Sequence, residues 1–249
     1  MGLITLLTDY KYKDFYLAKV EGRIKRLFTD DYLLHLSHGI CNFDLPQAVY
    51  NFNALLDEFS KEDFHFIFVN NHYSKNYSFV IAETKKHGFI VCPNNGILGL
   101  LNCEYIKFYH LPLTPSSFVE MEVLEKLKTK SKLLEELEEF ENPMMFRRIT
   151  TISTEKELKG EVIYIDGYGN CITNIKKSDF EDFIDNQPYH IKVKRHIIER
   201  ISNDYSDNQE AGISIFFNNQ GHLEVSNTHG NASKLLGLQV NSRISVKKN

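Results

Sequence analysis

The chain has 249 residues, of which 42% are hydrophobic and 25% are charged, and its formal net charge at pH 7 is -4. This ordinary globular balance excludes a mainly disordered chain, and the acidic excess disfavours nucleic acid as a partner. A chain of this length can form one large or two modest domains without disulfides or a structural metal.

Cysteine usage and apolar runs bear on the cellular compartment. The sequence contains four cysteines and no CxxC pair. Two of them, Cys92 and Cys171, stand in apolar runs typical of buried thiols in a reducing compartment. The first apolar run is too short for a signal peptide, and no run reaches the roughly 18 apolar residues of a membrane span. We therefore expect a cytoplasmic protein that makes no membrane contact.

The N-terminal part alternates strand and helix patterns. A continuous apolar run over 3–7 predicts a buried strand, and we expect Asp14 to cap a helix whose apolar residues recur over 17–28. A second strand is predicted over 32–36. The segment 44–46, Asp-Leu-Pro, opens a second helix with a capping residue and an early proline.

Further strands and a long helical stretch complete this part. Strand patterns lie at 64–69, 79–82, 89–92 and 105–109, and a turn at 93–96 leads into a short helix near Ile97. Residues 117–140 are rich in Glu, Lys and Leu and predict a long helix or helix pair with a charged, solvated face. Alternation of strands and helices predicts an α/β sandwich domain with a mostly parallel sheet over residues 1–148.

From about Ile149 the pattern changes to short strands separated by turns. These strands are predicted over 160–166, 171–176, 189–195, 213–217 and 222–226. Turn residues between them favour antiparallel hairpins. The fold class we predict is α/β, with the N-terminal domain followed by an antiparallel β-barrel domain over residues 149–249.

Polar residues follow the first two strands. Asp9 and Asp14, with Tyr10 and Tyr16, lie where ligands of α/β sheets collect, and His38 ends the second strand in the same layer. A role for Asp14 as a helix cap alone, and a structural role for His38, are the alternatives.

The loop over 166–170 combines an acceptor, an aromatic ring and an amide. Its glycines let the backbone turn sharply while Tyr168 projects a flat face, flanked by Asp166 and Asn170. An aromatic face beside an amide suits a purine base. A simple hairpin turn is the alternative. The turn over 218–221 and the later Asn227 are equally explained as loop chemistry.

Absent motifs narrow the class of protein. The sequence has no GxGxxG after its first strand, no GxxxxGK[ST], no HExxH and no GxSxG. The usual nucleotide hydrolases and serine esterases are therefore disfavoured, and no metal site is predicted.

Taken in order, several segments resemble the S-adenosylmethionine hydroxide adenosyltransferase family, which includes fluorinating and chlorinating enzymes. The resemblance covers nearly the whole chain, and its segments are 4–10, 37–48, 93–96, 165–175 and 219–225. It implies an α/β domain followed by a β-barrel. It also implies a homotrimer whose sites lie between the N-terminal domain of one subunit and the C-terminal domain of the next. No cofactor is implied, because S-adenosylmethionine is itself the substrate or ligand.

The resemblance also implies roles for acidic and hydroxyl-bearing residues. Asp9 holds the ribose diol, and Asp14 faces the methionine end together with Asp166. Tyr16 stands at a position that usually carries a hydroxyl.

Aromatic and amide residues take the base in the same scheme. Tyr168 and Tyr205 match the positions that sandwich adenine, and Asn170 matches the amide that reads its edge. Asn219 and Asn227 fall on further ligand-contact positions with changed residue types.

The chain departs from the family where water is activated. Family hydrolases carry an aspartate and a following arginine in a loop that corresponds to 69–74, where this chain has Asn70 and no arginine. A motif with histidine and arginine corresponds to 117–122, where Val119 and Met121 cannot move protons. His72 is the nearby titratable replacement. Displacement of methionine needs an oriented, partly deprotonated water, and loss of a general base costs roughly two to four orders of magnitude in rate.

Two functions follow from these residues. The first is hydrolysis of S-adenosylmethionine to adenosine and methionine with a rearranged water site. The second is a catalytically inactive nucleoside-binding protein that acts as a sensor or structural protein. Transfer to a halide is a weaker third possibility, because the sequence offers no clear halide pocket.

Overall fold

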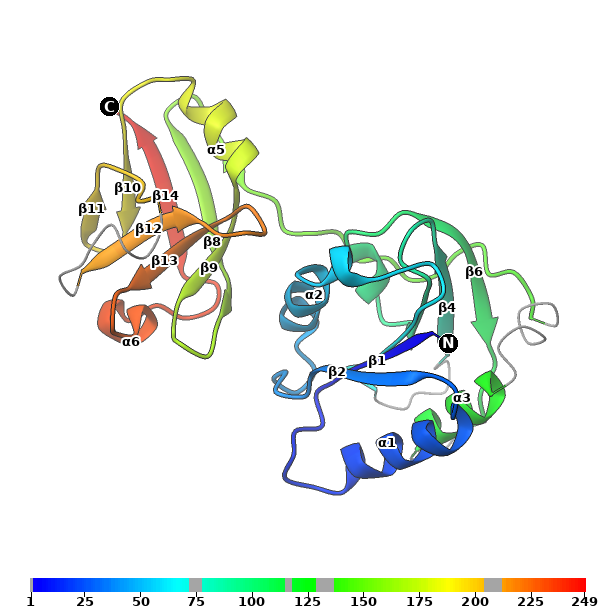
Figure 1. Ribbon diagram of the computed structural model, residues 1–249. Coiled ribbons are helices and arrows are strands. Elements are labelled where there is room, and N and C mark those ends of the chain that lie inside the picture. Colours follow the sequence, from blue (N-terminus) through cyan, green and yellow to red (C-terminus); the bar gives the residue numbers. More distant parts are fainter. Residues whose placement is uncertain (1, 72–77, 115–117, 129–136, 204–211) are drawn as a thin grey trace. The chain divides into compact units, whose positions relative to one another are not determined.

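A computed structural model describes residues 2–71, 78–114, 118–128, 137–203 and 212–249 (Figure 1). Two candidate site residues, His72 and Tyr205, lie outside the described residues. The chain divides into two compact units, Met1–Arg148 and Ile149–Asn249. We call them the first unit and the second unit, and each is described by itself.

The first unit is built on a six-stranded sheet with the order β2-β1-β3-β5-β4-β6. The pairs β2–β1, β1–β3 and β3–β5 are parallel, and β4 is antiparallel to both β5 and β6. The mostly parallel sheet that the sequence predicts is therefore confirmed. The strands are β1 (Leu3–Thr8), β2 (Tyr32–Ser37), β3 (Phe64–Phe68), β4 (Phe79–Thr84), β5 (Phe89–Pro93) and β6 (Tyr105–Leu111).

Helices cover both faces of this sheet, as buried parallel strands require. Alternate residues of β3 enter two apolar clusters, with Phe66 on one face and Ile67 on the other. On the Phe66 face, α1 (Tyr16–Leu27) and α3 (Val119–Leu127) lie side by side (Figure 1). The opposite face is covered by α2 (Leu45–Asn53) and by two short 3-10 helices, η1 (Leu56–Glu58) and η2 (Ile97–Leu100).

The starts of α1 and α2 differ in how they are capped. Asp44 caps α2 as predicted, because its side chain accepts a hydrogen bond of 3.0 Å from the backbone N–H of Gln47. The predicted cap of α1 by Asp14 is wrong. Phe15 is the N-cap residue and makes no side-chain cap bond, while Asp14 is exposed one position earlier. Packing of the apolar face of α1 against the sheet fixes this helix without a polar cap.

The predicted helix over 117–140 is also wrong at its C-terminal end. Helix α3 ends at Leu127, and residues 138–140 instead run beside β6. The N–H of His110 donates to the carbonyl of Glu138 at 3.2 Å, and the N–H of Phe140 donates to that of Phe108 at 2.8 Å. Phe140 packs against the cluster that lies under α2. Backbone pairing with an edge strand and burial of one aromatic ring override the helix propensity of the segment.

The second unit is an antiparallel sheet that curls into a half-barrel, which confirms the predicted β class. Its path is β11-β10-β14-β8-β9-β13-β12, and β7 pairs with β8. The strands are β7 (Ile152–Ser153), β8 (Glu157–Ile165), β9 (Cys171–Lys176), β10 (Tyr189–Val193), β11 (His196–Ile198), β12 (Ile213–Phe217), β13 (His222–Asn227) and β14 (Arg243–Lys248).

One predicted strand of this unit is divided in two. The strand expected over 189–195 ends at Val193, and Lys194, with φ of 54°, turns the chain into β11. Two helices that were not predicted from the sequence, α5 (Lys177–Ile184) and α6 (Ala232–Leu236), add Phe180, Phe183 and Leu236 to the apolar core.

Three findings bear on the class of protein. No helix among the described residues is long and apolar enough to cross a membrane. In the same part of the chain, no group of three or more His, Cys, Asp and Glu side chains is arranged to hold a metal ion. All four cysteines are free, and Cys92 and Cys171 are buried, as their apolar runs predict.

Candidate functional site

Asp9 follows β1 at the carboxyl edge of the first unit's sheet, and it is only 5% exposed. Its Oδ2 accepts hydrogen bonds from the backbone N–H of Phe43 at 2.9 Å and of Asn70 at 3.2 Å. Both donors have left-handed backbones, with φ of 67° and 58°, which non-glycine residues adopt uncommonly. A single carboxylate therefore joins the loops that follow β1, β2 and β3.

This arrangement engages one oxygen of the Asp9 carboxylate more than the other. Both recorded hydrogen bonds reach Oδ2, and among the described residues none is recorded to Oδ1. A carboxylate that two backbone donors hold in place presents its second oxygen in a fixed direction, which suits a pair of ligand hydroxyl groups. The carboxyl edge of a parallel sheet is also where ligands of open α/β folds bind.

An aromatic group adjoins this edge at the start of α1. The ring of Tyr16 stacks on Phe15 with centroids 4.6 Å apart and on Phe118 at 5.8 Å, and Tyr10 lies 6.3 Å from it. Tyr16 remains 42% exposed. Tyr16 therefore lies beside Tyr10, the residue that follows Asp9. The exposed Asp14 stands in the loop between Tyr10 and Tyr16.

His38 has a structural setting. It is 1% exposed, and its ring forms hydrogen bonds with Thr8 Oγ1 at 2.8 Å and with His35 Nδ1 at 2.7 Å. Burial, and then the charge of His35, lower the pKa of His38 to about 4. His38 is therefore neutral near pH 7 and connects the ends of β1 and β2.

Of the two candidate water-activating positions, Asn70 is described and His72 is not. Asn70 follows Val69, whose carbonyl accepts a hydrogen bond of 3.0 Å from Asn95 Nδ2. The N–H of Asn70 points to Asp9, as described above. The structure therefore places Asn70 directly beside the carboxylate that is predicted to hold the ribose.

A buried polar network next to Asn70 was not predicted from the sequence. Glu120, in the first turn of α3, is 6% exposed and accepts hydrogen bonds from Tyr10 Oη and from Asn71 Nδ2, the latter at 2.8 Å. Asn71 Nδ2 also donates to Tyr10 Oη at 3.0 Å. Burial, together with the Glu120 carboxylate, raises the pKa of Tyr10 well above its ordinary value. The phenol is therefore protonated and serves as a donor to Glu120.

A sequence signal for this network existed. Glu120 takes an apolar position in the pattern of α3, because it shares the buried face with Val123, Leu124 and Leu127. A carboxylate at such a position is unusual enough to mark a candidate functional residue. The family resemblance over 117–122 concerns a histidine and an arginine, and it therefore does not point to Glu120.

In the second unit, Asp166 organises the loop that carries Tyr168. Its Oδ1 accepts from the backbone N–H groups of Tyr168 and Asn170, both at 2.9 Å, and its Oδ2 accepts from Asn170 Nδ2 at 2.9 Å. Gly169 has φ of 87°, and a Cβ there would lie 2.1 Å from the Asn231 side chain. The loop is thus a tight turn, and it leaves the Tyr168 ring 82% exposed.

The two remaining candidate residues lie at opposite ends of β13. Val225 pairs with Cys171, so Asn227 stands at the same end of the sheet as the 166–170 loop. Asn219 lies in the turn before His222, at the Lys176 end of β9. A strand of this length separates the two ends by about 17 Å. The structure thus groups Asn227 with the 166–170 loop and separates Asn219 from it.

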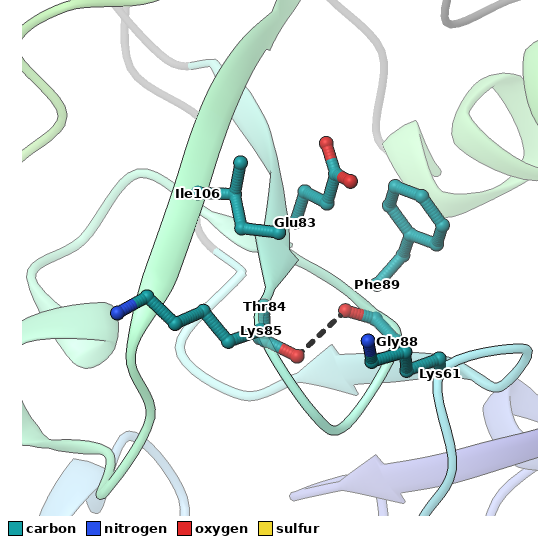
Figure 2. Close-up of a pocket in the computed structure, with 7 residues that line it drawn as sticks. All are labelled: Lys61, Glu83, Thr84, Lys85, Gly88, Phe89 and Ile106. Atoms are coloured by element: carbon teal, nitrogen blue, oxygen red, sulfur yellow. Dashed lines mark hydrogen bonds between the residues drawn. The ribbon is translucent and has the colours of Figure 1, made fainter.

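A small cavity in the first unit lies away from these residues (Figure 2). Its volume is about 130 Å³, below the roughly 300–1,000 Å³ of typical small-molecule sites. It adjoins the hairpin between β4 and β5, where Thr84 Oγ1 donates to the carbonyl of Gly88 at 2.9 Å. Because β4 is antiparallel to β5, this hairpin is at the opposite edge of the sheet from Asp9. The lining residues are Lys61, Glu83, Thr84, Lys85, Gly88, Phe89 and Ile106.

Comparisons with known proteins agree on both units. The family model "SAM hydroxide adenosyltransferase N-terminal domain", in which SAM denotes S-adenosylmethionine, matches residues 4–131, and its C-terminal counterpart matches residues 160–245. The (R)-S-adenosyl-L-methionine hydrolase of Methanocaldococcus jannaschii is 26% identical over an alignment of 271 positions, which covers 99% of this chain and 96% of the relative.

Two crystal structures have the same fold over the full chain. An uncharacterized conserved protein from Thermotoga maritima has a TM-score of 0.84 at 19% identity, with 98% of this chain and 100% of that chain covered. A conserved hypothetical protein from Thermus thermophilus has a TM-score of 0.78 at 20% identity, with 100% of both chains covered.

Proposed function

The chain belongs to the SAM hydroxide adenosyltransferase family, and on that premise we propose that it binds SAM and hydrolyses it to adenosine and methionine. The similarity over 99% of the chain to a protein named as a SAM hydrolase supports this reaction. The observation that carries the proposal is Asp9, a buried carboxylate that two backbone N–H groups hold at the carboxyl edge of the sheet.

In the first unit, Asp9 binds the ribose and its neighbours bind the amino-acid part of the ligand. Oδ1 of Asp9 accepts from the two ribose hydroxyl groups, since Oδ2 already holds Phe43 and Asn70. Asp14 is exposed and makes no cap bond, so its charge is available to the methionine ammonium group. Tyr16 lies beside it and contributes its hydroxyl.

In the second unit, the 166–170 loop binds the base. The exposed ring of Tyr168 stacks on adenine, and the Asn170 amide forms hydrogen bonds with the edge of the base. Asp166 fixes this loop through three hydrogen bonds and adds a negative charge for the methionine end. Asn227, which lies at the same end of the sheet, is a further ligand contact, and Tyr205 is the second aromatic partner of the base.

We place the complete site at a subunit interface of a cytoplasmic homotrimer, with the first unit of one copy facing the second unit of its neighbour. Exposed aromatic rings support an interface, because large apolar surfaces of this kind are usually covered in an assembly. Tyr12, Phe15 and Phe43 are 76%, 61% and 64% exposed near Asp9, and Tyr168 is 82% exposed.

The alternative is a nucleoside-binding protein that no longer hydrolyses SAM. Asn70 favours this alternative, because an amide orients a water molecule but does not take its proton. Binding and hydrolysis are separable, since the contacts to ribose and base do not involve Asn70's side chain.

Two measurements separate these functions. Purified protein is incubated with SAM and the products are separated by chromatography, with Asp9→Asn as the matched control. Thermal-shift titrations with SAM, adenosine and methionine report binding in parallel. Adenosine formed by the wild type and not by the control supports hydrolysis. A midpoint that rises with adenosine, without product from SAM, supports the alternative, and flat titrations for all three ligands contradict both.

A further inference from the structure

The network of Glu120, Tyr10 and Asn71 places a buried carboxylate where no established role requires one. Glu120 is 6% exposed, and its recorded hydrogen bonds come from two neutral groups, Tyr10 Oη and Asn71 Nδ2. Among the described residues, no ion pair to Glu120 is recorded. Burial of a carboxylate without a cation is unfavourable, and the helix N-terminus offsets only part of this cost.

The network is directly continuous with the ribose carboxylate. The backbone N–H of Asn70 donates to Asp9, and the side chain of the next residue, Asn71, donates to Tyr10, the residue after Asp9. Two consecutive residues of one loop therefore hold two consecutive residues of another. This connection attaches the Tyr10–Glu120 pair to the two loops that hold the Asp9 carboxylate, and Asp9 is near enough for its charge to contribute to the raised pKa of Tyr10.

Asn71 adds an acceptor with an unmet hydrogen bond. Its Oδ1 is buried and has no hydrogen-bond partner among the described residues, while its Nδ2 is committed to Tyr10 and Glu120. Buried polar atoms are nearly always satisfied, so an unpaired acceptor indicates a place for a ligand or water donor. In the proposed reaction, the attacking water can donate an O–H group to this acceptor.

We propose that Glu120 is the proton acceptor of the hydrolysis, and that the hydroxyl of Tyr10 carries the proton to it. This role of Glu120 rests on the proposed function. The oxygen of water forms a bond to C5′ of SAM, and the electrons of the C5′–S bond remain on sulfur, so the sulfonium leaves as the neutral thioether methionine. One water proton passes to Tyr10 Oη while the proton of Tyr10 passes to the Glu120 carboxylate. Glu120 releases this proton to solvent after the products leave.

The relay supplies what the family's missing residues would otherwise provide. Asn70 and the amide of Asn71 orient the water. Glu120 takes the proton of this water through the Tyr10 hydroxyl, which already donates a hydrogen bond to Glu120. Tyr10 contacts the reacting water in this scheme, and Glu120 acts through Tyr10. A purely structural role, in which the network only attaches α3 to the loops of the sheet, is the competing explanation.

The test compares Glu120→Gln and Tyr10→Phe with Glu122→Gln as the matched control. Glu122 is also on α3 but binds the backbone N–H of Thr114, away from the network. We expect Glu120→Gln to lower kcat by roughly 100- to 10,000-fold. KM, and the adenosine affinity measured by thermal shift, should change less than about threefold. The acidic limb of the kcat–pH profile should disappear in this variant. The double variant should be no slower than the slower single variant, because the two groups act as one unit.

Other outcomes overturn the relay in distinguishable ways. A Glu120→Gln enzyme with wild-type kcat and pH profile overturns it while hydrolysis stands. Loss of adenosine binding together with kcat assigns the network a structural role. If Glu120→Gln does not fold, Tyr10→Phe decides, since wild-type turnover in that variant contradicts the relay. A wild-type protein that binds adenosine and forms none from SAM overturns both hydrolysis and the relay.

Discussion

Asp9 and Asp166 are two carboxylates that both accept backbone hydrogen bonds, but they do so over different distances along the chain. Asp9 holds Phe43 and Asn70, which are 34 and 61 residues away. Asp166 holds Tyr168 and Asn170, which are 2 and 4 residues away. The Asp9 corner therefore exists only after three strands of the first unit have assembled, whereas the Asp166 loop is a local turn that the second unit displays.

Substitutions at the two carboxylates should therefore differ in how much of the structure they disturb. A change at Asp9 should disturb loops from three strands as well as the proposed ribose contact. A change at Asp166 should disturb one loop, and a change at Tyr168 should disturb the proposed base contact alone. Three measurements test this order, and a fourth compares the pH dependence of the two units.

The largest effect is expected for Asp9→Ala. It leaves the N–H groups of Phe43 and Asn70 without their acceptor in a buried corner, which should lower the free energy of unfolding by about 2–4 kcal/mol. Adenosine affinity should fall on the order of 100-fold, since hydrogen bonds to a charged group are lost. Urea denaturation and isothermal titration measure the two effects. Asp14→Asn is the stability control, and an Asp9→Ala variant as stable as that control would refute the assembly role.

A smaller, local effect is expected for Asp166→Ala. The variant loses the three hydrogen bonds that shape the loop, so the free energy of unfolding of the second unit should fall by about 1–2 kcal/mol. Hydrogen exchange should increase around residues 166–170 and remain unchanged in the first unit. Asp182→Asn, on the exposed side of α5, is the control. Increased exchange throughout the first unit would contradict a local role.

Tyr168→Ala should separate binding from stability. The ring is 82% exposed, so its removal should change the free energy of unfolding by less than about 0.5 kcal/mol. Adenosine affinity should fall by roughly 5- to 100-fold, because stacking of a base on an aromatic ring contributes about 1–3 kcal/mol. Tyr168→Phe keeps the stacking face and should bind normally. Equal affinity of the Ala and Phe variants would remove Tyr168 from the base site.

The pH dependence of stability compares the two units by the slope of the unfolding free energy per pH unit. Burial lowers the pKa values of His38 and His65 in the first unit and of His222 in the second unit from 6.5 to about 4. Between these values the unfolded chain binds protons that the folded chain does not. The stability that these neutral histidines contribute is therefore fully present above pH 6.5 and declines as the pH falls toward 4.

Substitution of one of these histidines should flatten that decline. His222→Gln should reduce the slope of the unfolding free energy by up to about 1 kcal/mol per pH unit in this window, as measured by urea titrations. His190→Gln, at a partly exposed position in β10, is the control. The first unit, which holds two of the shifted histidines, should lose stability more steeply with acid than the second. The opposite order would contradict this comparison.

Prediction from the sequence succeeded where neighbouring residues determine the structure. The strand over 171–176 and the Asp44 cap of α2 were predicted as observed, because alternation, turn residues and capping are properties of adjacent positions. Prediction failed over 138–140, where the partner of the backbone is β6, some 30 residues earlier in the chain. The predicted cap of α1 by Asp14 was also wrong, because packing against the sheet holds this helix without a polar cap.

The candidate site shows the same difference between local contacts, which were predicted, and long-range contacts, which were not. The 166–170 loop was recognisable from its own residues, since aspartate, glycine and an aromatic ring form the turn locally. Glu120 was not recognised, although its place in the apolar pattern of α3 was visible, because its partners Tyr10 and Asn71 are 110 and 49 residues away.

By itself, the sequence determined the fold class, most of the strands and the tight turn over 166–170, since each of these depends on short-range periodicity and turn chemistry. Tertiary structure alone decided that Asp9 accepts from two left-handed loop residues, that Asn219 is separated from Asn227, and that Glu120 is buried beside Tyr10. The physical reason is that hydrogen bonding and burial of charge depend on which distant segments meet, and that is fixed only when the sheet and its helices have packed together.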